Sequence, residues 1–190
     1  ESNCSMESSL ASIEKNTKVK VKERCRDYWL LAKPGIIFGN LITAIAGFLL
    51  ASHQQIQLSL FLMMVVGLSL VIASACVFNN IIDKDLDSKM NRTKNRPLPR
   101  QSISMTSAWC YGTVLGLLGS CLLLYRVNLL SALIAIFGFC FYVFCYTYSK
   151  YVTSYGTLIG SIAGSTPPLV GYVAVSQGLD APSLLFFLVI

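Results

Sequence analysis

Long apolar segments constrain this chain more than any other feature of its sequence. Five of them reach the roughly 20 residues that a helix needs to cross a bilayer, and a sixth begins near Ser183 and reaches Ile190. They cover residues 28–51, 58–82, 107–125, 128–149 and 155–175. Only 13% of the residues are charged, against about 25% in soluble domains. The sequence therefore predicts an all-α, polytopic bundle of transmembrane helices.

The ends of the chain differ from these spans. Residues 1–27 are polar and mixed in charge, without the apolar core of a cleaved secretory signal. We expect a partly disordered cytoplasmic tail on the membrane surface, anchored by Tyr28 and Trp29 at the start of a membrane domain over residues 28–190. Because the sequence starts with Glu and stops inside the apolar run LLFFLVI, we expect it to be a fragment.

Basic residues are unevenly distributed among the loops. Of the 15 Lys and Arg residues, all but Arg126 lie in the tail through Lys33, in the loop after the second span or at Lys150. The positive-inside rule places these parts, and the N-terminus, in the cytoplasm, or in the matrix if the membrane is mitochondrial. The lack of an Arg- and Ser-rich presequence favours a bacterial inner membrane. Topology and anionic lipid account for the basic clusters, so we expect no nucleic-acid partner.

The second span runs into a charged stretch, NNIIDKDLDSKMNRTKNRPLPR, at residues 79–100. Asn79, Asp83 and Asp87 recur at every fourth residue, so they share one face of a helix that continues from the span. Asp85 falls on the opposite side. Two carboxylates one turn apart repel each other unless a cation neutralises them, and Mg²⁺ prefers oxygen ligands together with substrate phosphates. The spacing predicts a Mg²⁺ site on this face.

Cations follow directly on these carboxylates. Arg92 and Arg96 stand among further Lys residues, and Arg binds phosphate with two parallel hydrogen bonds. A metal and a group of cations would stabilise the charge that develops on a diphosphate leaving group. The alternative is a simple topological anchor, but an anchor needs only cations and has no use for acidic residues in register.

The same residues resemble a known family. The pattern NxxxDxxxD at residues 79–87, followed by RTxxRP at residues 92–97, is similar to the first aspartate-rich motif of the UbiA superfamily of intramembrane prenyltransferases. KPGIIFGNLITAIAGFLLAS, CVFNNIIDKDLDSKMNRTKNR and SYGTLIGSIAGSTPPLVGY are together similar to the branch that attaches a farnesyl group to heme. Asn-Asn before the first Asp, where quinone-pathway relatives usually carry Asn-Asp, supports that branch.

The resemblance implies an activity and partners. The complete protein would have nine transmembrane helices and would transfer the farnesyl group of farnesyl diphosphate, with Mg²⁺, to a vinyl group of heme b. Heme b is then a substrate rather than a cofactor, and the product is heme O for a terminal oxidase. The implied partners are the lipid bilayer and either heme A synthase or a terminal oxidase.

The resemblance also implies roles for particular residues. The implied site consists of the metal ligands Asn79, Asp83 and Asp87 and the diphosphate contacts Arg92, Arg96 and Lys33. Asp83 and Asp87 would be the catalytic pair. Asn40 and Tyr155 are candidates for lining the cavity, because polar groups in spans usually face the bundle interior. Polar packing between helices is an equal alternative for both.

Part of the family pattern is missing before Ile190. The superfamily has a second aspartate-rich motif later in the chain, and Asp180 stands alone in a loop expected on the opposite side of the membrane. We therefore expect this piece to be inactive by itself. Two alternative functions stay open. One is a related prenyltransferase with an aromatic quinone precursor as acceptor, and the other is an ion-coupled transporter, against which the cations beside the aspartates argue.

Smaller features complete the set of expectations. We interpret the GxxxGxxxG run at residues 156–164 as a surface for close helix packing, and we expect Pro167 and Pro168 to interrupt the fifth span. His53 is expected in a solvated loop opposite the aspartates. The 7 cysteines lack metal-ligand spacing and should be free thiols.

Overall fold

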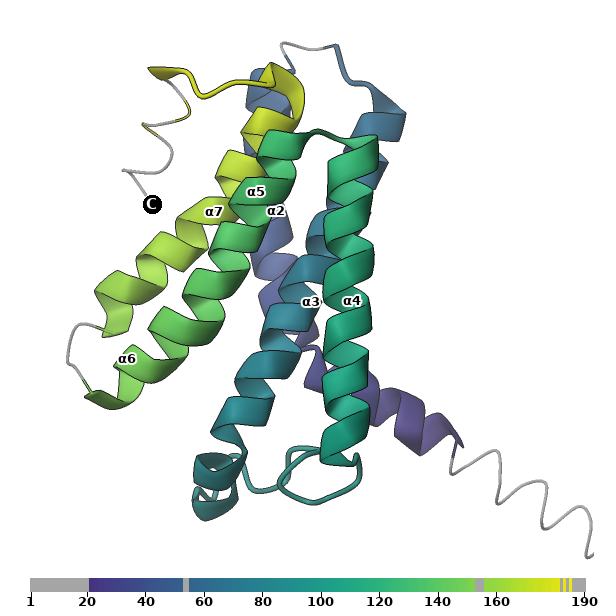
Figure 1. Ribbon diagram of the computed structural model, residues 1–190, viewed down its shortest axis with the longest axis vertical. Coiled ribbons are helices and arrows are strands. Elements are labelled where there is room, and N and C mark those ends of the chain that lie inside the picture. The colour runs from purple at the N-terminus through teal and green to yellow at the C-terminus, as the bar shows by residue number, and fades with distance from the viewer. Residues whose placement is uncertain (1–20, 53–54, 153–155, 182, 184, 186–190) are drawn as a thin grey trace, which may run out of the picture.

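A helical bundle makes up the part of the chain that the computed structural model describes, which is residues 21–52, 55–152, 156–181, 183 and 185 (Figure 1). Four stretches within it are long and apolar enough to cross a membrane: α2 (Pro34–Ala51), α3 (Leu58–Lys89), α4 (Met105–Arg126) and Leu129–Ser149. The fifth predicted span forms α7 (Gly156–Ser176), a helix of 21 residues. The predicted all-α class and multi-pass bundle are confirmed.

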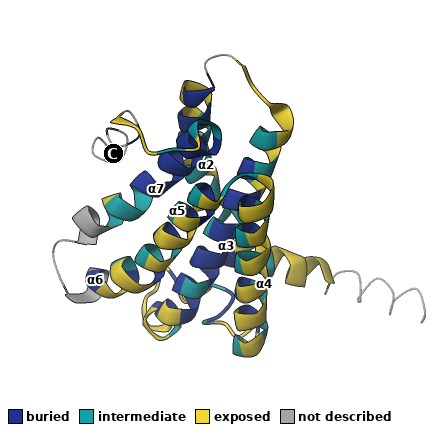
Figure 2. Ribbon diagram, turned by 45° about the horizontal axis from the view of Figure 1, so that its top comes forward, coloured by how far each residue is buried: buried dark blue, intermediate teal, exposed yellow. Residues whose placement is uncertain are grey.

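The helices pack in two neighbouring pairs, α3 along α4 and α2 along α7, and α5 (Leu129–Cys140) connects the pairs by contacting α4 and α7. The main core lies between them and includes Phe48, Met64, Leu123 and Val170. Figure 2 shows buried residues turned toward the middle of the bundle and exposed ones on the outer faces. Many exposed side chains are large and apolar, as a surface facing lipid requires.

Close contact between α2 and α7 depends on two glycines. A side chain on Gly47 would collide with the carbonyl oxygen of Pro168, and one on Gly171 would collide with that of Ala44. Small residues allow two helix backbones to approach in this way. The α2 and α7 backbones therefore approach each other closely because these two positions carry no side chain.

The prediction that proline interrupts the fifth span is wrong. Helix α7 continues through Pro167 and Pro168. Proline at 167 removes the N–H that would donate to the carbonyl of residue 163, and the Thr166 hydroxyl donates to the Ala163 carbonyl oxygen instead, at 2.8 Å. Side-chain hydroxyls satisfy freed carbonyls in this way in membrane helices, so the helix stays intact.

The first predicted span, 28–51, is also wrong at its start. Residues 21–31 form a separate helix that leaves the bundle sideways, and residues 21–27 of it belong to the segment predicted to be a partly disordered tail (Figure 1). Helix α2 begins at Pro34, and Lys33 before it has a left-handed backbone with φ 53°. Proline disfavours the helical conformation in the residue that precedes it, which breaks the helix at this point.

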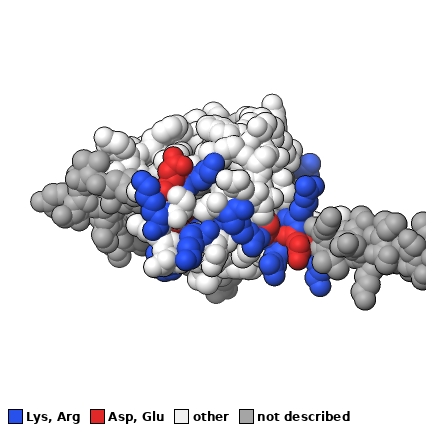
Figure 3. Space-filling model, turned by 90° about the horizontal axis from the view of Figure 1, so that it is seen from below, with Lys and Arg blue, Asp and Glu red and all other residues white. Residues whose placement is uncertain are grey.

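Charge is concentrated at one end of the bundle. Figure 3 shows Lys and Arg side chains gathered on the face seen from below, where α3 ends and α4 begins, while Arg126 ends α4 at the opposite end. This distribution agrees with the loop asymmetry of the sequence, and the side of the membrane stays a prediction.

The six cysteines of the described residues are free, as predicted. His53 lies outside the described residues.

Candidate active site

The acidic face of α3 is buried although it carries charge. Only 2% of Asn79, 4% of Asp83 and 6% of Asp87 is exposed, whereas Asp85 is exposed. Helix α3 continues without a break to Lys89, so the spacing of four residues places the three buried side chains on one face. Burial of two carboxylates at a helix end requires partners that compensate for their lost hydration.

Asn79 is held by two elements that are distant in sequence. The ammonium of Lys33 donates to its Oδ1 at 2.5 Å, and its Nδ2 donates to the Thr147 hydroxyl at 2.9 Å. The break before α2 thus brings a cation onto α3, and the amide is fixed from both sides. Thr147 was not among the predicted site residues, since nothing in the sequence links it to Asn79.

Asp87 is held by the loop that follows α3. Arg96 Nη1 lies 2.6 Å from its Oδ2, and the Thr93 hydroxyl donates to its carbonyl oxygen at 3.0 Å. Thr93 thereby satisfies one of the carbonyls that the end of a helix leaves unpaired. Because the Arg96 side chain is 37% exposed, solvent screens the pair, and it contributes less than about 1 kcal/mol to stability. Its main effect is to fix Arg96 beside the acidic face.

The sideways helix of residues 21–31 is fastened to the same region. Asp27 forms an ion pair with Arg100, and Asn80 Nδ2 donates to the Leu31 carbonyl oxygen at 2.7 Å. Burial raises the pKa of Asp27, but hydrogen bonds from Ser102 and Arg100 and nearby guanidinium charges together bring that pKa below its ordinary value. Sequence reasoning missed these contacts, although a polar Asn80 in an apolar helix was a signal.

A cationic hollow lies beside the acidic face. It has a volume of about 330 Å³, and its lining includes Lys33, Arg92, Arg96 and Asn80. Arg92 is exposed. The structure thus brings together the three residues predicted to contact a diphosphate, which come from the α2 junction and from the loop after α3.

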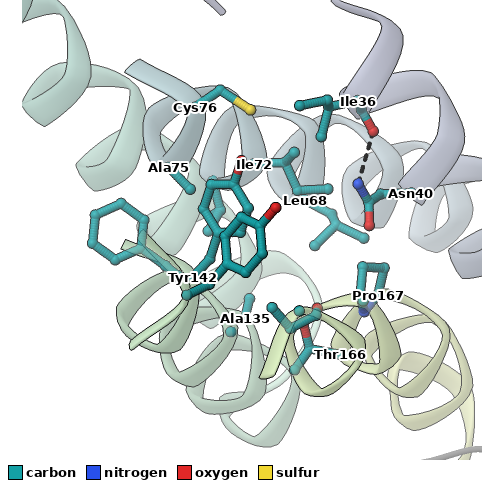
Figure 4. Close-up of a pocket in the computed structure, with 17 residues that line it drawn as sticks. Ile36, Asn40, Leu68, Ile72, Ala75, Cys76, Ala135, Tyr142, Thr166 and Pro167 are labelled. Carbon is teal, nitrogen blue, oxygen red and sulfur yellow. Dashed lines mark hydrogen bonds between the residues drawn. The ribbon is translucent and has the colours of Figure 1, made fainter. Parts of the chain in front are cut away.

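An apolar cavity of about 670 Å³ occupies the space between α2, α3, α5 and α7 (Figure 4). Asn40 lies on its wall and donates to the Ile36 carbonyl oxygen at 2.8 Å, while Tyr155 lies outside the described residues. Gly160 and Gly164 line the same cavity, and nothing lies within 4 Å of a side chain added at Gly164. The predicted close helix packing is therefore wrong for Gly164, whereas at Gly160 an added side chain would press on the Tyr146 ring.

The cavity reaches to within about one helical turn of the acidic face. Cys76, one turn before Asn79, lies on its wall, as does Tyr142. The arrangement combines buried oxygen ligands, adjacent cations and an apolar chamber of the size that holds small ligands in proteins, roughly 300–1,000 Å³.

The oxygen atoms of Asn79, Asp83 and Asp87 suit a hard divalent cation, but water or a bound phosphate must supply the remaining ligands. Within the part of the chain that the structure describes, no group of three or more His, Cys, Asp and Glu side chains could hold a metal. Asn79, Asp83 and Asp87 offer two carboxylates and one amide, all oxygen donors. Lys33 and Arg96 place positive charge on this set, as a metal would. Mg²⁺ is usually bound by one or two carboxylates and completes its coordination with water and phosphate oxygens.

Comparison with known proteins identifies the family. The family model described as "UbiA prenyltransferase family" matches residues 40–190. A protein named Protoheme IX farnesyltransferase from Francisella tularensis subsp. novicida (strain U112) is 52% identical over 166 residues, covering 86% of this chain and 59% of that protein. One of the same name from Sodalis glossinidius (strain morsitans) is 51% identical over 165 residues, covering 86% and 56%. The chain thus spans less than two thirds of these relatives.

Two solved structures have a similar fold. A structure described as that of digeranylgeranylglyceryl phosphate synthase in membranes has a TM-score of 0.77 and 26% identity, covering 87% of this chain and 58% of that one. A UbiA homolog from Aeropyrum pernix K1 has a TM-score of 0.63, 23% identity and coverage of 78% and 54%, and it supports the fold alone. With the match of the family model over residues 40–190, the chain belongs to the UbiA prenyltransferase family.

Proposed function

We propose that the complete protein transfers the farnesyl group of farnesyl diphosphate to a vinyl group of heme b, giving heme O for a terminal oxidase. The observation that carries this proposal is the buried face of Asn79, Asp83 and Asp87 between a cationic hollow and an apolar cavity. Relatives about 52% identical over 166 residues are named Protoheme IX farnesyltransferase, which supports the choice of donor and acceptor.

The acidic face and the cationic hollow have separate tasks. Prenyltransferases of this family generally use a divalent metal, and we assign Mg²⁺ to Asn79, Asp83 and Asp87, where its charge would stabilise the diphosphate. Arg92 and Arg96 bind the phosphate oxygens. Lys33 adds a third positive charge from the α2 junction.

The reaction is charge-balanced with water as the only further reactant. The bond between C1 of the farnesyl chain and the diphosphate oxygen breaks, and its electron pair leaves with the diphosphate. The π electrons of the vinyl group form the new carbon–carbon bond to C1. Water adds to the cation left on the vinyl carbon and loses a proton. The apolar cavity excludes other water from the allylic cation until the acceptor has reacted.

The cellular setting follows from the same proposal. The basic end of the bundle faces the cytoplasm, by the positive-inside rule, in a bacterial inner membrane or its mitochondrial counterpart. The product passes to a heme A synthase or to a terminal oxidase. Because the chain covers 59% of its Francisella relative, the activity is assigned to the complete protein, and these 190 residues are expected to be inactive by themselves.

Analysis of extracted hemes tests the proposal. The complete protein is expressed in a strain that cannot make heme O, and hemes and quinones are separated by chromatography. We expect heme O to appear in the membranes. Prenylated quinone precursors without heme O would instead indicate an aromatic acceptor. Ion-driven flux without either product would indicate a transporter.

A further inference from the structure

A π-helical turn in the fourth membrane stretch directs two tyrosines toward the cavity. The turn, η1, covers Phe141–Tyr146. A π-helix closes its hydrogen bonds between residues five apart, and Tyr142 and Tyr146 stand four residues apart within this turn. The rings of Tyr142 and Tyr146 stack with centroids 5.2 Å apart and planes 19° apart. Both line the cavity, and Figure 4 shows the Tyr142 ring near its centre.

Tyr142 is also tied to the acidic face. Its carbonyl oxygen accepts a hydrogen bond from the Thr147 hydroxyl at 3.0 Å, and that hydroxyl accepts from Asn79 at 2.9 Å. The tyrosine therefore lies between the charged end of α3 and the apolar chamber, and the proposed function would place the first carbons of the prenyl chain here.

We propose that Tyr142 is a further catalytic residue, whose ring face stabilises the positive charge that develops on the allylic carbon of the prenyl diphosphate. The inference rests on the proposed function. An aromatic face attracts a cation within about 6 Å, most strongly where water is excluded. The ring forms no bond and transfers no electron, so the balance of the reaction is unchanged. Tyr146 supports the Tyr142 ring from its other face.

Binding of two probes to the full-length protein separates charge from shape. Farnesylamine, which is an ammonium ion at neutral pH, is added with inorganic diphosphate to mimic the ionised substrate. S-farnesyl thiodiphosphate has the same chain without charge at C1. For Tyr142→Leu we expect the Kd of farnesylamine to rise about 30-fold, equivalent to about 2 kcal/mol, while the Kd of the thiodiphosphate changes less than threefold. Tyr142→Phe keeps the ring and should leave both Kd values within threefold of wild type.

Matched controls address folding and position. Tyr148 lies on the same stretch but is 70% exposed, so Tyr148→Leu should leave both Kd values unchanged. If Tyr142→Leu lowers the thermal midpoint or fails to insert, Tyr142→Met replaces it with a side chain that fills more of the same space. The kcat and KM of farnesyl transfer are measured for the same variants. In Tyr142→Leu we expect kcat to fall and KM to change little.

The outcomes distinguish the two proposals. If Tyr142→Leu weakens the binding of both probes equally, the residue only shapes the cavity. If Tyr142→Phe weakens the binding of farnesylamine, the effect belongs to the hydroxyl. Either result overturns the inference and leaves farnesyl transfer standing. A wild-type protein that binds neither probe and transfers no farnesyl group contradicts the proposed function itself.

Discussion

The charged end of α3 and the contact between α2 and α7 are held together in different ways. At the charged end, Lys33 and Arg96 contact Asn79 and Asp87 through hydrogen bonds and an ion pair that is partly open to solvent. Between α2 and α7, backbones touch at Gly47 and other small residues. Polar contacts at a partly exposed end contribute little to stability, whereas a packed interface tolerates no added volume. The residues proposed to take part in the reaction and the contacts that stabilise the fold therefore lie in separate regions of the molecule.

Substitution on the acidic face should give the largest effect. Asp83→Asn or Asp87→Asn in the complete protein removes a charge from the proposed metal and diphosphate site. We expect heme O formation to fall at least about 100-fold, while the protein still inserts and its thermal midpoint changes little. Asp85→Asn is the control, because Asp85 is exposed. Normal heme O levels in membranes of either variant would contradict the assignment of the metal site.

A substitution at the α2–α7 contact should act on stability first. Gly171→Val places a branched side chain against the Ala44 carbonyl, and overpacking of this kind costs about 1–3 kcal/mol. We expect a lower thermal midpoint in detergent, with activity lost in proportion to unfolded protein. Gly164→Ala is the matched control, since it meets nothing within 4 Å. An unchanged midpoint in Gly171→Val would show that this contact is not tight.

Removal of one cation should have an intermediate effect on binding. Arg96→Gln loses a phosphate contact, and a charge-assisted hydrogen bond contributes about 1.5–3 kcal/mol, so we expect the KM for farnesyl diphosphate to rise roughly tenfold. The thermal midpoint should fall only modestly, because the Arg96 guanidinium is 37% exposed although its loss leaves the buried Asp87 carboxylate without this ion pair. Arg126→Gln, at the opposite end of α4, is the control. A large stability loss with unchanged KM would assign Arg96 to structure instead.

The smallest effect should appear at acid pH. The pKa of Asp27 is lowered in the folded protein, so its ion pair with Arg100 contributes stability that is complete above the unfolded pKa, about 3.9. That stability is lost as pH falls through the lower folded pKa. Thermal midpoints measured against pH should show a steeper acid loss for wild type than for Asp27→Asn or Arg100→Gln. Parallel profiles for all three proteins would contradict this assignment.

Sequence reasoning located the parts of the site that are local in the chain. Asn79, Asp83 and Asp87 share a helix face, and a period of four residues in one helix is readable without a structure. The cavity, by contrast, is built from four helices, and their packing is not encoded in any one segment. The clamp between Asp27 and Arg100 joins residues 73 positions apart, which no local pattern indicates.

Other misses have equally physical causes. The π-helical turn over Phe141–Tyr146 changes which side chains of the fourth stretch share a face, and no pattern in the sequence marks it, so the inward direction of Tyr142 could not be predicted. Pro167 was expected to interrupt a helix. The Thr166 hydroxyl satisfies the Ala163 carbonyl oxygen instead, and whether it can do so depends on the Thr166 side-chain rotamer, which the sequence does not give. Conversely, the break at Lys33 follows from the proline after it and was readable in the sequence.

The unbroken course of α3 from the apolar region to Lys89 has a consequence for how this gene can change length. Each residue in an α-helix turns the chain by about 100°, so one codon inserted after Cys76 would rotate every ligand of the acidic face away from Lys33 and Thr147 together. A deletion would do the same in the other direction. A point substitution in this segment changes one side chain at a time, whereas a change of length moves all of those that follow.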